Sequence, residues 1–219
     1  IDTTAPLQML NDLAIKNDSG FESDDLLTNV TEQSLQSSLS QSLVVGERLQ
    51  LKHNESDWQD ISSSLTDSVL NHRILLVEGD NQLSFRVADA ANNLGPESQY
   101  IVELDQTAPE FVSQQLISSN VVPNIAGLGD RITLTIVADE PILLPETLLI
   151  AGAKAELQRL ADNSFSANVI IDDNLANGLV GYEFALTDRA GNISQPRNES
   201  AADSIIIDSS APTALMQEI

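Results

Sequence analysis

Carboxylates recur in this sequence at a fixed spacing, inside a five-residue motif that we call the joint motif. Its three copies are Asp2-Thr3-Thr4-Ala5-Pro6, Asp105-Gln106-Thr107-Ala108-Pro109 and Asp208-Ser209-Ser210-Ala211-Pro212. The spacing is 103 residues both times, which exceeds the roughly 20–50 residues of solenoid repeats and matches a small domain of about 100–150 residues. Carboxylate oxygens suit hard cations such as Ca²⁺. A carboxylate that returns once per domain, at the domain boundary, is therefore a candidate cation ligand.

The charge balance narrows the possible partners. Ten basic residues stand against 33 acidic ones, which gives a formal net charge of −23. This charge argues against nucleic acid, whose partners carry a basic surface, and against docking on anionic lipid. Two interpretations stay open: the carboxylates form a solvated, soluble surface, or some of them cluster to hold a cation.

The residue types that are missing exclude further chemistry. The chain has no cysteine, so disulfides, thiolate metal sites and a cysteine nucleophile are excluded. Calcium can supply the stiffness that disulfides give to small extracellular domains. No run approaches the ~18 consecutive apolar residues of a membrane span, so we expect no membrane insertion. His53 and His72 are not at zinc-ligand spacing, and neither a Gly-x-Ser-x-Gly motif nor a phosphate-binding glycine loop occurs, so we expect no enzyme.

A second repeated motif, here called the turn motif, follows an alternating apolar run in each half of the chain. It reads Asp89-Ala90-Ala91-Asn92-Asn93 and Asp188-Arg189-Ala190-Gly191-Asn192, and the copies lie 99 residues apart. Asn92 and Gly191 correspond, and because these residue types best tolerate a left-handed backbone, we expect a turn with φ > 0. Asp89 and Asp188 can accept backbone N–H groups within this turn, or they can bind a cation.

Short apolar runs with a period of two predict the fold class. Leu83, Phe85 and Val87, for example, alternate with polar residues, and Gly, Asn, Asp and Pro separate one such run from the next. This pattern predicts an all-β chain of antiparallel sandwiches.

The joint motif sets the predicted domain boundaries. We expect one domain at 1–104, a second at 105–207, and the start of an incomplete third repeat at 208–219. Two segments do not show a clear pattern. Residues 34–42 are either an extended loop or a weak edge strand, and Glu156–Leu160 can form one short helical turn.

Three motifs together carry a resemblance to a known family. They are the joint motif, the turn motif and the stretch Asp18-Ser19-Gly20-x-x-Ser23 with Thr28-Asn29. The chain resembles the bacterial immunoglobulin-like tandem repeats of large RTX and biofilm-associated surface adhesins. The resemblance implies sandwiches of about seven strands, joined end to end by short linkers. It also implies secretion to the bacterial cell surface and calcium at or near the joints.

The sequence departs from the family pattern at two places. Asn92 stands where the family favours glycine, and the second domain has no Asp-Ser-Gly loop but shows Ser118-Ser119-Asn120-Val121-Val122-Pro123 instead. The second domain resembles a different subtype. We therefore expect the two domains to bind calcium unequally.

An immunoglobulin-like topology brings three stretches to one end of a sandwich. They are the N-terminal joint, the loop between the second and third strands, and the loop between the sixth and seventh. For the second domain these stretches supply the expected calcium ligands Asp105, Asp139, Glu140 and Asp188. The equivalent ligands at the first joint are Asp2 and Asp89.

The loop between the first and second strands lies at the opposite end of a sandwich. In the first domain this loop carries Asp18, Asp24 and Asp25, which are further expected ligands. Acid then gathers from both sides at the junction of the two domains. Such crowding is repulsive without a cation and becomes a clamp with one.

Three functions are consistent with the sequence. The first is a structural one: spacer repeats of a bacterial cell-surface adhesin that are stiffened by calcium, monomeric, and in contact with neighbouring repeats, while other domains bind a host or surface ligand. The second is an adhesion module that itself binds a glycan, a protein or a copy of itself. The third is a set of accessory domains of a secreted enzyme.

Overall fold

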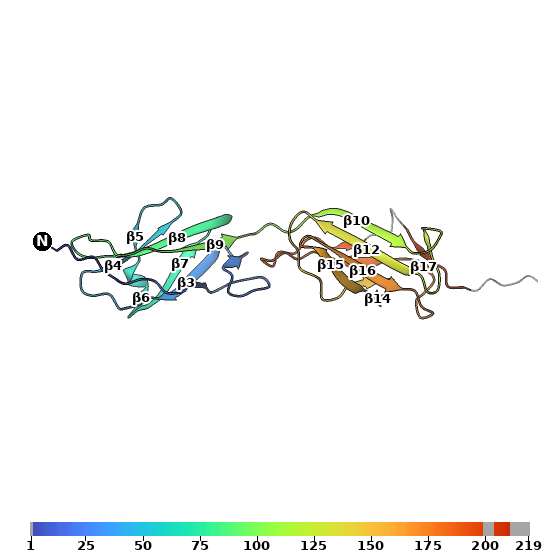
Figure 1. Ribbon diagram of the computed structural model, residues 1–219, viewed down its shortest axis with the longest axis horizontal. Helices are drawn as coiled ribbons and strands as arrows, with labels where there is room; N and C mark the ends of the chain where they lie inside the picture. Colours follow the sequence, from blue (N-terminus) through green and yellow to red (C-terminus); the bar gives the residue numbers. More distant parts are fainter. Residues whose placement is uncertain (1, 199–203, 211–219) are drawn as a thin grey trace, which may run out of the picture. The chain divides into compact units, whose positions relative to one another are not determined.

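Alternating apolar side chains make strands the dominant element of the chain (Figure 1). The computed structural model describes residues 2–198 and 204–210. In this part of the chain the helical structure is a single 3₁₀ turn, η1 (Ser62–Ser64), and no helix is long or apolar enough to cross a membrane. The chain divides into two compact units, Ile1–Thr107 with Arg189–Asn192 and Ala108–Asp188 with Ile193–Ile219.

The first unit is a sandwich of two sheets. One sheet has the strand order β1 (Ala14–Ile15), β3 (Glu32–Ser38), β7 (Val69–Leu75), β6 (Leu65–Thr66). The other has the order β2 (Leu27–Thr28), β9 (Ser98–Leu104), β8 (Gly79–Ala88), β4 (Arg48–His53), β5 (Gln59–Asp60). All pairs are antiparallel except β2 with β9. These orders match the two sheets of an immunoglobulin-like sandwich, with β2 as a second piece of the first strand.

Strand β8 shows how the sequence builds the first core. Leu83, Phe85 and Val87 are at most 1% exposed, and the residues between them are half-buried. Successive side chains of a strand point to opposite faces, so the apolar set faces inward as one row. Leu35 of β3 and Leu70 of β7 belong to the same core.

The second unit is also a sandwich. One sheet has the order β10 (Phe111–Ser118), β12 (Arg131–Ala138), β16 (Ser164–Ile170), β15 (Glu156–Ala161). The opposite layer has two parts, β14 (Ala153–Lys154), β13 (Leu149–Ile150), β18 (Tyr182–Phe184), β19 (Arg197–Asn198) and β11 (Ile125–Ala126), β20 (Ile206–Ile207), β17 (Gly178–Leu179). Ile132, Leu134 and Ile136 are fully buried in its core beside Phe165. The predicted all-β sandwich class is confirmed.

Both alternatives for segment 34–42 are wrong for its first half. Residues up to Ser38 belong to β3, which is a central strand because it pairs with both β1 and β7. Its inward positions are Gln33 and Leu35, which are 1% and 0% exposed. A glutamine in the core interrupts the apolar alternation on which strand prediction depends.

The short helical turn expected at Glu156–Leu160 is also wrong. The segment is the edge strand β15, antiparallel to β16 with Leu157 opposite Ala167. The three-residue spacing of Leu157 and Leu160 imitates a helical face, whereas Leu160 is exposed. An edge strand needs little burial, so its residue pattern is a weak signal.

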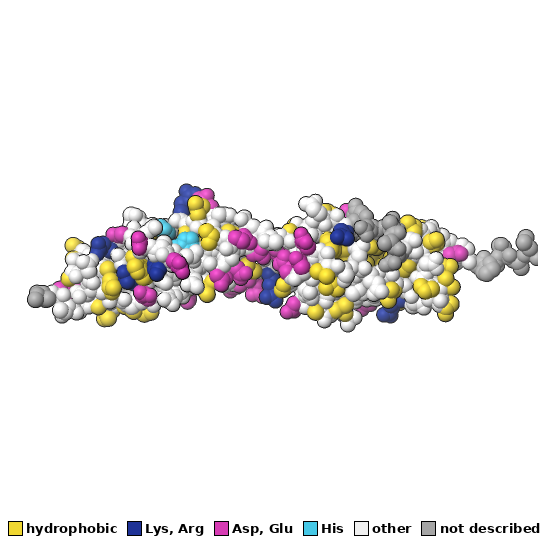
Figure 2. All heavy atoms as spheres, turned by 90° about the horizontal axis from the view of Figure 1, so that it is seen from above, with side chains coloured by type: hydrophobic (Ala, Val, Ile, Leu, Met, Phe, Trp, Pro, Cys, Tyr) yellow, Lys and Arg dark blue, Asp and Glu magenta, His cyan; other side chains and the backbone are white. Residues whose placement is uncertain are grey.

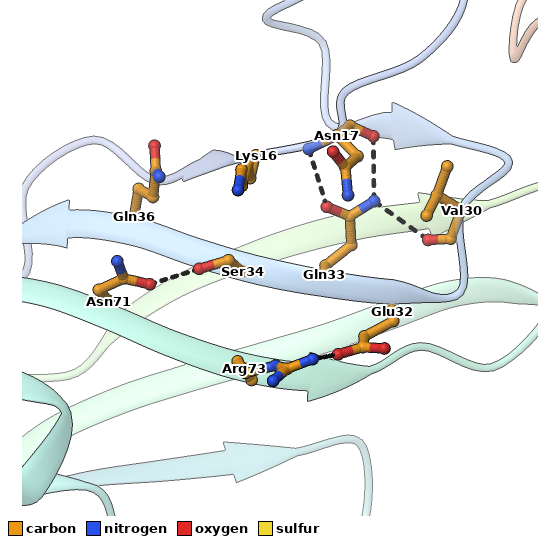
Figure 3. Close-up of a pocket in the computed structure, with 9 residues that line it drawn as sticks. All are labelled: Lys16, Asn17, Val30, Glu32, Gln33, Ser34, Gln36, Asn71 and Arg73. Carbon is orange, nitrogen blue, oxygen red and sulfur yellow. Dashed lines mark hydrogen bonds and ion pairs between the residues drawn. The ribbon is translucent and has the colours of Figure 1, made fainter.

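The buried amide of Gln33 holds the acidic loop of the first unit to β3 (Figure 3). Its Nε2 donates to the carbonyls of Asn17 and Val30, at 3.0 Å each, and to Thr28 Oγ1 at 3.1 Å. Its Oε1 accepts the N–H of Asn17 at 3.1 Å. One side chain thus fixes both ends of the loop. Figure 3 shows this brace at one side of a shallow groove, with the Arg73–Glu32 ion pair at the other.

We expect Gln33→Leu to lower the free energy of unfolding of the first unit by about 1–3 kcal/mol, because it leaves buried backbone groups without partners. Denaturant unfolding followed by Trp58 fluorescence measures this, since Trp58 is the sole tryptophan and belongs to the first unit. Gln36→Leu, at an exposed position of the same strand, is the control. Equal effects of the two substitutions would contradict the assigned role of Gln33.

Candidate metal centre

Each described copy of the joint motif forms the same local turn. The Oδ1 atom of Asp2 accepts the N–H of Thr4 at 2.9 Å. Asp105 accepts from Thr107 at 2.9 Å and Asp208 from Ser210 at 3.0 Å in the same way. An aspartate that bonds the backbone two residues on is the signature of an Asx turn. In each copy one of the two carboxylate oxygens of the aspartate is therefore already a hydrogen-bond acceptor within the turn.

The last residue of the turn motif holds the joint motif in place. Asn93 Nδ2 donates to the carbonyl of Asp2 at 3.2 Å, and Asn192 Nδ2 donates to the carbonyl of Asp105 at 2.8 Å. The same side chain therefore makes the same bond in both copies. We did not expect this role from the sequence, although asparagine at the fifth position of both turn motifs was the available signal.

A second clamp holds the residue that follows the aspartate of the joint motif. Glu78 Oε1 accepts the N–H of Gln106 at 3.2 Å, and Asn177 Oδ1 accepts the N–H of Ser209 at 2.9 Å. Each clamp residue directly precedes a glycine with positive φ, which is 85° in one unit and 133° in the other. Glu78 and Asn177 occupy the same position before a glycine but differ in residue type, so comparing the two halves of the sequence did not reveal this role.

Asp89 makes the hydrogen bonds of the turn interpretation. Its Oδ1 accepts the N–H groups of Ala91 and Asn93 at 2.8 Å each, and its Oδ2 accepts Asn93 Nδ2 at 2.7 Å. The side-chain bond from Asn93 is the main reason that the pKa of Asp89 lies below its ordinary value, and the nearby charge of Arg48 lowers it further. Arg48 also donates to Asn92 Oδ1 at 2.8 Å. A cationic side chain is thus already present near Asp89.

Three of the expected ligands come together. Carboxylate oxygens of Asp105, Glu140 and Asp188 all lie within 4.8 Å of one another, the only such group of three acidic, histidine or cysteine residues among those that the structure describes. Asp105 directly follows β9, Glu140 lies just beyond β12, and Asp188 bridges Ile142 in the turn motif. Asp188 is 1% exposed, whereas the other two are half-buried.

The donor set of this group fits calcium. Oxygens that share one Ca²⁺ at about 2.3–2.6 Å lie within about 5 Å of one another. The set contains only carboxylates, which suit hard cations, and lacks the nitrogen and sulfur ligands that favour zinc.

Asp139 does not belong to this group. Its Oδ1 accepts the N–H of Glu110 at 2.7 Å, and its own N–H donates to the carbonyl of Glu110 at 3.1 Å. The carboxylate of Asp139 therefore braces the segment that enters β10, while its neighbour Glu140 lies in the group.

Acidic side chains crowd around the carboxyl end of β9 in the first unit (Figure 2). The pKa of Glu103 is raised by burial and, in decreasing order, by the charges of Asp80, Asp105 and Asp25. The pKa of Asp18 is raised by burial, and Asp25 and Asp24 add to this against the opposing bond from the N–H of Leu26.

The carboxylate of Asp18 is only half satisfied by hydrogen bonds. Its Oδ2 accepts the N–H of Leu26 at 3.2 Å, whereas its Oδ1 is buried and has no hydrogen-bond partner. Asp25 Oδ1 accepts the N–H of Leu27 at 3.1 Å. Asp18, Asp24 and Asp25 do not converge as closely as the Asp105 group among the described residues. Asp80 and Glu103 join the crowding without having been expected to, because charged residues at outward positions of β8 and β9 give no signal of convergence.

The corresponding loop of the second unit is closed by its own hydrogen bonds. Asp130 Oδ2 accepts Asn120 Nδ2 at 2.6 Å and the N–H of Gly127 at 2.7 Å. These bonds, the one from Asn120 first, hold the pKa of Asp130 below its ordinary value. The loop of the second unit thus holds one carboxylate, stabilised by hydrogen bonds, whereas the loop of the first unit holds several carboxylates that repel one another.

Comparisons with known proteins show remote likeness only. No family model matches the sequence, and no curated protein matches it. A structure described as giving insight into host cell surface retention of a 1.5-MDa bacterial ice-binding adhesin matches with a TM-score of 0.45 and 14% identity, over 95% of this chain and 67% of that one. Fibronectin(III)-like modules of CbhA from Clostridium thermocellum match with a TM-score of 0.41 and 12% identity, over 90% and 93%. At these values neither likeness decides the function of this chain.

The crowding predicts an unusual response to acid. For Glu103, whose folded pKa is raised above the ordinary 4.5, the charged form destabilises the fold at neutral pH. This penalty is relieved as the pH falls through the raised pKa towards 4.5. Asp89 and Asp130 act in the opposite sense, because their lowered pKa values give stability that is lost as the pH falls below 3.8.

We therefore expect Glu103→Gln to raise the melting temperature of the first unit by a few degrees at pH 7 in chelator. The difference from the wild-type chain should shrink as the pH approaches 4.5. Trp58 fluorescence during heating measures both. Glu55→Gln, at an exposed turn position, is the matched control. A Glu103→Gln chain that melts below the wild type at pH 7 would show that Glu103 is stabilising instead.

Proposed function

We propose that this chain is a pair of tandem spacer repeats from a bacterial cell-surface adhesin and that calcium stiffens the joint motif. The support is of two kinds. The sequence motifs resemble those of bacterial immunoglobulin-like repeats, the chain divides into two compact sandwiches, and equivalent hydrogen bonds hold two copies of the joint motif. A role in extension needs repeated, self-contained domains, and this chain has that organisation.

The observation that carries the calcium proposal is the convergence of Asp105, Glu140 and Asp188. One carboxylate oxygen of Asp105 already accepts a hydrogen bond within its own Asx turn. Like charges this close repel one another, and the repulsion grows where water is excluded, as it is around Asp188. A divalent cation bound by these three residues, with water completing its shell, would reverse the sign of the interaction.

The first unit supplies further acid to the same proposal. Asp18 has a buried oxygen without a hydrogen-bond partner, and Asp24, Asp25, Asp80 and Glu103 crowd the surroundings of Asp105 and Asp18. Asp2 and Asp89 fit calcium less well, because Arg48 already places a positive charge near Asp89, and no group of three close carboxylates forms there among the described residues. The proposal therefore places calcium at the second joint motif in preference to the first.

The proposed setting is extracellular. Calcium-binding modules outside the cell typically have dissociation constants of about 10⁻⁴–10⁻³ M, so a site of this kind would be filled where calcium is abundant. The spacer would be monomeric, would contact neighbouring repeats of its own chain and would hold a distal domain that binds a host or surface ligand, a role compatible with adhesion or biofilm formation.

Calcium should stabilise the chain by mass action. At a hundredfold excess of free calcium over the dissociation constant, we expect a gain of about 2.7 kcal/mol, or roughly 10–20 °C in the melting temperature of a unit of this size. Calorimetry in calcium and in chelator measures the gain, and small-angle scattering under both conditions tests for a stiffer particle. Magnesium at the same ionic strength controls for screening. Identical melting and scattering in calcium and chelator would refute the calcium mechanism.

The Asp105 group is tested by Glu140→Gln, which removes one charge and keeps the side-chain volume. We expect weaker calcium binding in titration calorimetry and a smaller calcium-induced rise in melting temperature. Glu146→Gln, at an exposed position of the same unit, is the control and should bind calcium as the wild type does. Unchanged calcium affinity in Glu140→Gln would remove this group from the proposal.

A further inference from the structure

The groove of Figure 3 lies within the first sandwich, on the outer face of the sheet that contains β1, β3 and β7. Its volume is about 640 Å³, which is within the roughly 300–1,000 Å³ of small-molecule sites. Such sites are mostly lined by apolar side chains. Here eight of the nine lining residues are polar or charged, and Val30 is the apolar one. A ligand that fits this groove therefore makes many hydrogen bonds.

The strand register places two cationic side chains on either side of Ser34. Ser34 of β3 lies opposite Arg73 of β7. On its other side, the N–H of Lys16 donates to the carbonyl of Ser34 at 3.1 Å. Neighbouring strands are about 4.8 Å apart, so the backbones that carry the two cations are roughly 10 Å apart. All three side chains line the groove.

Hydrogen-bonding side chains lie between and beside the two cations (Figure 3). Ser34 Oγ donates to Asn71 Oδ1, and Gln36, which lies opposite Asn71 in the register, is exposed beside it. Asn17 is held at one end of the groove by two hydrogen bonds between its backbone and the buried amide of Gln33. This end of the groove is therefore formed before a ligand arrives, which lowers the entropy cost of binding.

The groove carries a positive local charge on a strongly acidic chain. Lys16 and Arg73 against Glu32 give a net charge of +1 for the lining residues, whereas the whole chain has a net charge of −23. Glu32 pairs with Arg73, but a guanidinium has five N–H donors and can bind a second acceptor. Lys16 forms no ion pair with any residue that the structure describes. The complementary ligand therefore carries a negative charge.

We propose that this groove binds an acidic saccharide. The carboxylate of a uronic acid residue lies between Lys16 and Arg73, and its hydroxyl groups bind Ser34, Asn71 and Gln36. A simple anion would pair with the cations but leave the amides unused, and a neutral sugar would do the reverse. The proposal goes beyond the spacer function, because a repeat that separates other domains would also hold a polysaccharide itself.

The second sandwich provides an internal comparison. On the outer face of its sheet, Thr133 Oγ1 donates to Asn168 Oδ1 at 2.7 Å, the same kind of bond as that from Ser34 to Asn71. The residue opposite Thr133 on β10 is Ile117, and the residue opposite Asn168 on β15 is Glu156. An apolar side chain and a carboxylate thus flank this bond in place of two cations. We expect no uronic acid binding on this face.

The test is amide NMR of the full chain, titrated in chelator with a short oligomer of galacturonic acid. The oligomer should shift the backbone amides of Lys16 and Ser34 and leave Thr133 unchanged. A galactose oligomer of the same length lacks the carboxylate, and inorganic phosphate lacks the sugar hydroxyls. We expect each of them to bind at least about fivefold more weakly. Chelator is needed because calcium can itself bridge carboxylates of the saccharide and of the protein.

Lys16→Gln, at an exposed position, should weaken binding of the galacturonic acid oligomer at least about fivefold, and Lys16→Arg should restore it. Lys52→Gln makes the same charge change on the other sheet of the same sandwich and is the matched control. It should bind as the wild type does, and Trp58 emission confirms that each variant is folded.

Four results would overturn the proposal. They are no shift at Lys16 and Ser34, an equal shift at Thr133, equal affinity for galactose or phosphate, and equal effects of Lys16→Gln and Lys52→Gln. Because every measurement is made without calcium, failure of the calcium mechanism would leave this result unaffected.

Discussion

Repulsion between carboxylates at the carboxyl end of β9 is the constraint on which the rest of this account depends. Hydrogen bonds hold the Asp105 backbone firmly: Asn192 binds its carbonyl, and Glu78 binds the next amide. Burial first, and neighbouring carboxylates after it, raise the pKa values of Glu103 and Asp18, so the fold disfavours their charged forms. The cation that we propose would offset this repulsion.

The acidic residues of this chain lie in different surroundings. Asp89 is neutralised locally, by hydrogen bonds and by Arg48, and Asp130 is satisfied by Asn120 and Gly127. Asp105, Glu140 and Asp188 have carboxylate oxygens within 4.8 Å of one another, and the charge of Asp105 also acts on Glu103. The 33 acidic residues are therefore not all close to other carboxylates. Asp89 and Asp130 accept hydrogen bonds from asparagine side chains, whereas Glu103 lies near other carboxylates.

The sequence predicted the sandwich class and most strands, because alternation such as that of Leu83, Phe85 and Val87 reflects burial directly. It failed at β3, where buried Gln33 breaks the alternation, and at β15, where an exposed edge leaves no pattern. The split between Asp139 and Glu140 was also invisible. Asp139 accepts the N–H of Glu110 just before β10, whereas Glu140 lies in the acidic group, and nothing in the sequence distinguishes these two adjacent acids. The hydrogen bonds from Asn93 and Asn192 to the joint motifs could not be predicted, because the sequence does not show which loops lie close together.

A diffraction map of this chain crystallised with calcium tests the central claim most directly. The account predicts an ion at about 2.3–2.6 Å from carboxylate oxygens of Asp105, Glu140 and Asp188. A well-ordered map with abundant calcium that shows only water among these three carboxylates would contradict it.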